Sequence, residues 1–117
     1  MPCDETLERL QREAWIGDAV LTLFARTRIL ATENRVDAEL AAAMTSNQFL
    51  SAFGDPTSAE AELGRVYEEY GLTYAFDWID AQWMPLFRRQ RERRLRGKGM
   101  AGPSKSKGAM RAKEEFR

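Results

Sequence analysis

The stretch from Asp4 to Leu30 constrains the fold of this chain more than any other. Apolar side chains recur along it at the spacing of helix turns, which predicts one long first helix. Shorter helices are expected in an alanine-rich segment that opens at Val36-Asp37, and over residues 47–53, 57–71 and 72–83. No run of alternating β-branched residues bounded by turn signals occurs. The sequence therefore predicts an all-α fold.

Several expected helices carry signals at their ends. Thr45 or Ser46 could cap the short third helix. Thr57 and Glu60 have the spacing of a capping box, and Gly71 suits a C-terminal cap. Pro85 is expected to kink the last amphipathic segment or to restart it at a first-turn position. Such a small helical body buries a limited fraction of its surface, so we expect a homodimer that covers part of the first helix.

Charge is distributed unevenly along the chain. Residues 88–117 hold 12 Lys and Arg against 3 acids, whereas the preceding 87 residues hold 6 basic and 15 acidic side chains. Beyond Gly97 the chain has few side chains to bury, so we divide it into a compact domain, residues 1–96, and a basic flexible tail, residues 97–117. A basic end suits a polyanion as partner, although it could also serve solubility alone. The candidate phosphate-binding residues are Arg88, Arg89, Arg91, Arg93, Arg94, Arg96 and Lys98.

The sequence contains no histidine. This excludes the commonest general base and the nucleophile pairs that depend on it. Any hydrolytic chemistry must then use carboxylates, most naturally with a hard ion such as Mg²⁺ or Mn²⁺. The N-terminus lacks a signal-peptide pattern and the apolar runs are too short to span a membrane. We expect a cytoplasmic protein with no membrane partner.

Asp18 stands out within the apolar first helix. It is the only charged residue between Ala14 and Ala25. An ionised carboxylate in apolar surroundings must be neutralised, paired or bound to a metal. Gly17 beside it allows another backbone to approach closely, at a helix cost of about 1 kcal/mol relative to alanine. Periodicity leaves two interpretations open: a metal ligand facing a cleft, or a structural ion pair with Arg12 or Arg65.

Three segments resemble one enzyme family in order. WIGDAVLTLFARTRIL is similar to the signature helix of ribonuclease III, typically E-R-L-E-F-L-G-D-A-V-L, and MTSNQFLSAF is similar to that family's middle segment. AEAELGRVYEEYGLTYAFDWI resembles the second signature, through Glu60, Ala61, Gly64, Tyr67 and Gly71. The resemblance covers roughly residues 7 to 85. It implies a compact ribonuclease III-like helical domain that cleaves double-stranded RNA.

The departures from the family pattern point to its short Mini-III branch. Two carboxylates of the first signature fall on Gln11 and Ala14, and one of the second falls on Thr57, with Asp55 close by. The connection between the signatures is short, and no double-stranded-RNA-binding domain follows in this sequence. Mini-III enzymes also lack the extra domain, have alanine before the aromatic-Ile-Gly-Asp, keep only the Asp and the Glu, and trim structured ribosomal RNA precursors as homodimers.

By this resemblance, Asp18 and Glu60 are the catalytic and metal-binding residues. Together they would hold Mg²⁺, which generates the attacking hydroxide and stabilises the departing oxygen. Glu60 could instead be only a helix cap, and Asn47 could orient the metal-binding groups or cap a turn. Tyr67 and the tryptophans are expected in the core.

Two other functions stay open at this point. One is a non-catalytic RNA-binding or ribonucleoprotein assembly protein with a degenerate ribonuclease III fold. The other is a helical interaction module in which Asp18 is merely salt-bridged.

Overall fold

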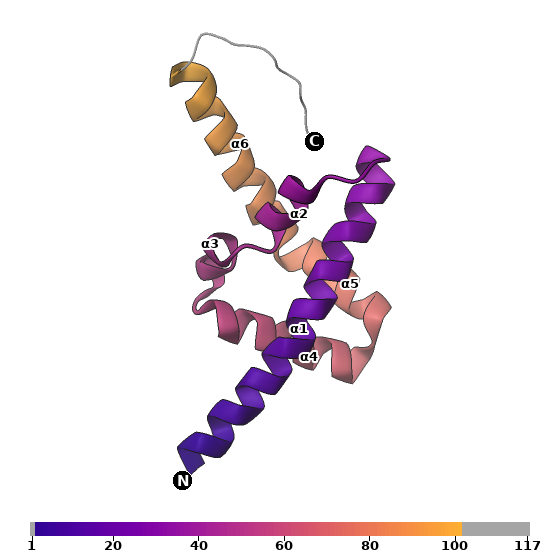
Figure 1. Cartoon of the computed structure of the whole chain (residues 1–117), viewed down its shortest axis with the longest axis vertical. Helices are drawn as coiled ribbons and strands as arrows, with labels where there is room; N and C mark the ends of the chain where they lie inside the picture. Colours follow the sequence, from indigo (N-terminus) through magenta and orange to yellow (C-terminus); the bar gives the residue numbers. More distant parts are fainter. Residues whose placement is uncertain (1, 102–117) are drawn as a thin grey trace. The chain divides into compact units, whose positions relative to one another are not determined.

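The structure, a computed structural model, describes residues 2–101, with side chains described for residues 5–96. Within these residues every regular element is a helix, which confirms the all-α prediction. The elements are α1 (Pro2–Glu33), α2 (Ala38–Met44), α3 (Asn47–Leu50), a 3₁₀ turn η1 (Ser51–Phe53), α4 (Pro56–Tyr70), α5 (Leu72–Gln82) and α6 (Met84–Ala101) (Figure 1).

Residue contacts divide the chain into two units, Met1–Ile79 and Asp80–Arg117. The first unit contains α1 to α4 and most of α5, and the second contains the end of α5 and all of α6. The predicted boundary at residue 97 falls inside α6, and residues 102–117 of the predicted tail lie outside the described residues.

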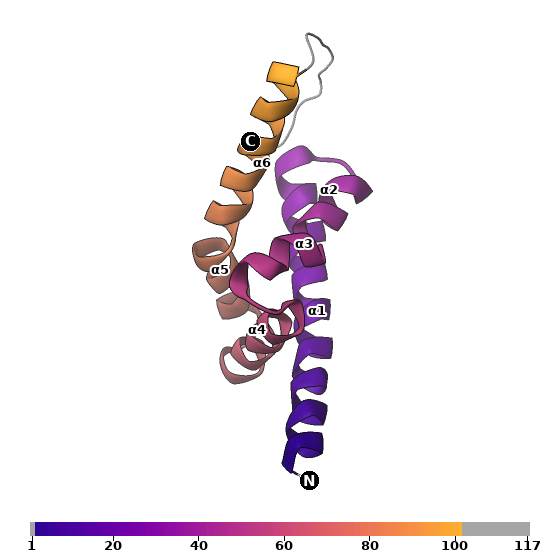
Figure 2. The ribbon, with the colours of Figure 1, turned by 90° about the vertical axis from the view of Figure 1, so that its left-hand side faces the viewer.

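The first unit is organised around the crossing of α1 and α4. These two helices form the most extensive helix pair in this unit; α4 crosses α1 in Figure 1 and lies beside it in the view turned by 90° (Figure 2). Leu21 and Phe24 of α1 and Leu63 of α4 are fully buried. Phe24 also packs edge-to-face on Phe76, with ring centroids 5.4 Å apart. Burial of each such side chain stabilises the fold by about 1.5–3 kcal/mol.

Most predicted helix ends occur where the sequence placed them. Asp37 caps α2, its carboxylate accepting from the Leu40 backbone at 3.0 Å. Ser46, rather than Thr45, caps α3 by accepting from Phe49. Gly71 ends α4 with a φ of 93°, a conformation that side-chain-bearing residues rarely adopt. Pro85 is the second residue of α6, so it restarts a helix.

The predicted start of α4 is wrong. The helix begins at Pro56 and its cap is Asp55, whose carboxylate accepts from the Ser58 backbone nitrogen at 3.1 Å. Proline is preorganised for the first helical position, which favours this start over the capping box of Thr57 with Glu60. Glu60 consequently lies in the second turn of α4, too far along the helix to cap it.

One face of α1 is exposed in the single chain. Trp15 is 79% exposed, Leu23 44% and Leu30 51%. The prediction of core tryptophans is therefore wrong for Trp15, whereas Trp83 is buried. No helix among the described residues combines the length and apolar character needed to cross a membrane.

Candidate metal centre

Two glycines bring α1 and α4 into backbone contact. A Cβ built on Gly17 would lie 3.0 Å from the backbone nitrogen of Gly64 and would overlap the carbonyl of Glu60. A Cβ built on Gly64 would lie 3.2 Å from the backbone nitrogen of Gly17 and would overlap the carbonyl of Glu13. Real Cβ atoms do not tolerate such contacts, so the crossing requires glycine on both helices.

This crossing brings Asp18 and Glu60 together. Asp18 follows Gly17, and the Glu60 carbonyl faces Gly17. Partial burial, the Asp18 charge and a hydrogen bond shared with Asp18 together raise the pKa of Glu60 from 4.5 to about 7. The two carboxyl groups therefore interact directly although they come from different helices.

A nearby positive charge would relieve the electrostatic repulsion within this pair. Two adjacent carboxylates repel each other, and burial together with the Asp18 charge raises the pKa of Glu60. A divalent cation removes the repulsion and accepts oxygen ligands from both side chains. The donor set therefore fits Mg²⁺ or Mn²⁺, with water and substrate oxygens completing the coordination.

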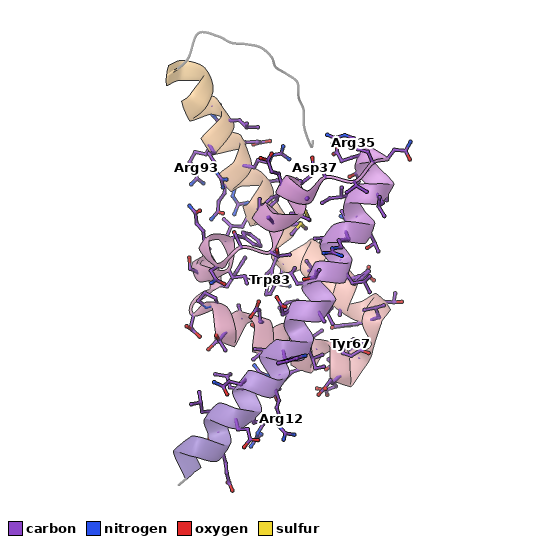
Figure 3. All side chains as sticks on the ribbon, in the orientation of Figure 1. Arg12, Arg35, Asp37, Tyr67, Trp83 and Arg93 are labelled. Carbon is purple, nitrogen blue, oxygen red and sulfur yellow. The ribbon has the colours of Figure 1, made fainter. Side chains whose placement is uncertain are left out.

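The structural alternative for Asp18 is wrong in both of its proposed forms. Arg12 binds Glu8 one turn away on α1 at 3.2 Å, and it extends from the N-terminal half of that helix (Figure 3). Arg65 binds Glu13 at 2.8 Å. Asp18 has no ion pair with an arginine or a lysine among the residues whose side chains are described.

The other residues considered from the sequence do not join the pair. Ala14 is buried, Gln11 is exposed, and Asp55 is engaged as the α4 cap. Asn47 is the exposed first residue of α3, where Ser46 performs the capping. Over the described part of the chain, no group of three or more acids, cysteines or histidines could hold a metal.

Asp18 is exposed, and Glu60 is half-buried. Surface hollows of about 580 and 770 Å³ lie in the first unit, the former between α1 and α2 and the latter lined largely by residues 8–16 of α1. Neither is lined by Asp18 or Glu60.

The predicted phosphate-binding residues belong to α6. Five of the arginines are exposed and one, Arg91, is half-buried; Figure 3 labels Arg93 on this helix. The exposed ones are Arg88, Arg89, Arg93, Arg94 and Arg96. Lys98 lies within the helix, and its side chain is outside the described ones. Exposure leaves the guanidinium groups accessible to phosphate oxygens.

Comparison with known proteins adds no relative. No protein-family model matches the sequence, and no curated protein or solved structure is significantly similar to it.

Proposed function

We propose that this chain is a metal-dependent hydrolase whose centre is the Asp18–Glu60 pair. The observation that carries the proposal is the meeting of two carboxyl groups from α1 and α4, neither of which forms an ion pair with a basic side chain of residues 5–96. Keeping like charges together costs stability, and a ligand that brings positive charge offsets that cost.

We further propose that the substrate is structured or double-stranded RNA, cleaved in the manner of the Mini-III branch. Enzymes for small molecules enclose most of their ligand in a pocket. Asp18 is instead exposed, which suits a large substrate that covers the site when it binds. Double-stranded RNA is recognised mainly through its shape and backbone, for which the exposed arginines of α6 are suitable groups.

The roles of the residues follow from this assignment. Asp18 and Glu60 hold Mg²⁺ or Mn²⁺ and fix its position on α1 and α4, whose contact sets the spacing of the two carboxylates. A divalent ion at this point supplies activation of water and stabilisation of charge on the phosphodiester. The basic side chains of α6 bind the RNA backbone without sequence preference.

A homodimer formed over the exposed face of α1, which carries Trp15, belongs to the same proposal. So does a cytoplasmic location.

The test compares cleavage of long double-stranded RNA, with Mg²⁺ and with Mn²⁺, by the unmodified protein and by Asp18→Asn and Glu60→Gln. Both variants are expected to fold and to lose cleavage. Glu62→Gln is the matched control, because Glu62 is an exposed acid on the same helix as Glu60. Cleavage by Asp18→Asn at the unmodified rate would contradict the proposal.

The exposed arginines also favour the second candidate function, a non-catalytic RNA-binding or assembly protein. Binding that weakens with salt, without cleavage in either metal, would select it. Substitution of Arg93, Arg94 and Arg96 by glutamine should then reduce the slope of log affinity against log salt concentration, by roughly one for each phosphate that the variant no longer binds.

A further inference from the structure

The crossing of α1 and α4 is built from the same short pattern on both helices. Glu13-Ala14 precedes Gly17 by the same spacing with which Glu60-Ala61 precedes Gly64. The contacts are reciprocal: Gly17 faces the carbonyl of Glu60, and Gly64 faces the carbonyl of Glu13. Both alanines are buried. The two helices therefore present equivalent positions to each other around the contact.

The equivalent positions differ in charge at one residue. Asp18 follows Gly17, and Arg65 follows Gly64. Each of these side chains meets the glutamate of the opposite helix: Arg65 binds Glu13 at 2.8 Å, and Asp18 interacts with Glu60. On one side of the crossing, Arg65 thus neutralises Glu13, whereas on the other side the carboxyl groups of Asp18 and Glu60 lie together.

We propose that the Glu13–Arg65 ion pair is a positioning device that fixes the crossing and thereby holds Asp18 and Glu60 at a spacing suited to a divalent cation. The role as metal ligands rests on the proposed function, whereas the control of spacing does not. Glu13 and Arg65 act through the helix contact and do not touch the cation. The pair is suited to this role because it joins α1 to α4, whereas the Arg12–Glu8 pair joins two turns of α1 alone.

The glutamate of the pair is largely shielded, with 18% of its side chain exposed against 51% for Arg65. A guanidinium held by a shielded carboxylate restricts both rotation and sliding of the two helices at the point of backbone contact. Without it, the repulsion between Asp18 and Glu60 would act to separate the helices on the opposite side of the same contact.

The first experiment measures Mn²⁺ affinity in variants that keep the net charge of the pair at zero. Single substitutions would change the local charge as well as the contact, so the informative protein is Glu13→Gln/Arg65→Gln. Its dissociation constant for Mn²⁺ is expected to rise roughly tenfold. The exchange Glu13→Arg/Arg65→Glu should recover most of that affinity. Glu8→Gln/Arg12→Gln, the matched control, should bind Mn²⁺ like the unmodified protein.

The second experiment measures the spacing without metal. In a Cys3→Ser background, Asp18→Cys/Glu60→Cys provides two thiols, and their effective concentration is measured from disulfide equilibrium with glutathione. Addition of Glu13→Gln/Arg65→Gln should lower that effective concentration roughly tenfold. An unchanged effective concentration of the thiols overturns the positioning role, and so does unchanged Mn²⁺ affinity in Glu13→Gln/Arg65→Gln. If the unmodified protein binds no Mn²⁺ but the effective concentration of the thiols falls in the variant, the proposed function fails and the positioning role stands.

Discussion

Gly17→Ala tests the helix contact on which the candidate site depends. The added methyl group would overlap the Glu60 carbonyl and lie 3.0 Å from the Gly64 nitrogen. Overpacking of this kind costs about 1–3 kcal/mol, and the upper end applies because backbone atoms cannot rotate away as side chains do. Alanine returns about 1 kcal/mol through its higher helix propensity. The net loss is then about 2 kcal/mol, which corresponds to a fall in melting temperature of roughly 8–16 °C for a domain of this size.

The same substitution should weaken Mn²⁺ binding about tenfold, because the helices must separate where Asp18 and Glu60 meet. Thermal unfolding measures the loss of stability, and titration with Mn²⁺ measures the loss of metal affinity. Gly54→Ala is the control: it strains a backbone with a φ of 110° but meets no atom within 4 Å. It should therefore lose stability and keep Mn²⁺ affinity. A Gly17→Ala protein as stable as the unmodified one would refute the close-contact argument.

Three further outcomes are expected. Because the folded-state pKa of Glu60 is raised from 4.5 to about 7, its contribution to stability is present below pH 4.5 and is lost as the pH rises through about 7. The metal-free protein should therefore melt at a lower temperature at pH 8 than at pH 5, with a smaller difference in Glu60→Gln. Trp15→Lys should shift a dimer to monomer in sedimentation without lowering the melting temperature of the monomer, since Trp15 is 79% exposed. Asp18→Arg should raise the melting temperature at pH 8 and abolish stabilisation by Mn²⁺, because it places a cation opposite Glu60 as Arg65 stands opposite Glu13.

The helices could be predicted because their signals are local. Periodicity along α1 and the glycine after α4 depend only on neighbouring residues, and both predictions are confirmed. The start of α4 was predicted wrongly because two capping signals compete within a few residues. Asp55 followed by Pro56 satisfies the helix end, and this leaves Glu60 free to meet α1.

The partners of Asp18 and Arg65 could not be predicted from periodicity alone. A helical wheel shows which side chains share a face, but it does not show which other helix lies against that face. Charge complementarity made Arg65 a reasonable partner for Asp18, whereas the structure pairs Arg65 with Glu13. The signal that could have indicated this pairing is the repeated Glu-Ala-x-x-Gly pattern at 13–17 and 60–64, which predicts a reciprocal crossing.

The reciprocal crossing explains why a carboxylate stands in the most apolar part of α1. An arginine at position 18 would give both sides of the contact the same ion pair and would remove the repulsion at Glu60. The chain instead keeps the less stable pair of carboxyl groups on one side of the contact, and the Glu13–Arg65 ion pair lies on the other side. A site in which like charges repel each other lowers the stability of the metal-free fold, and an ion pair nearby can keep that fold intact. A ligand that binds the site then offsets the repulsion, which favours binding. Stability alone would favour arginine at position 18, so aspartate there agrees with the cation-binding role proposed for it together with Glu60.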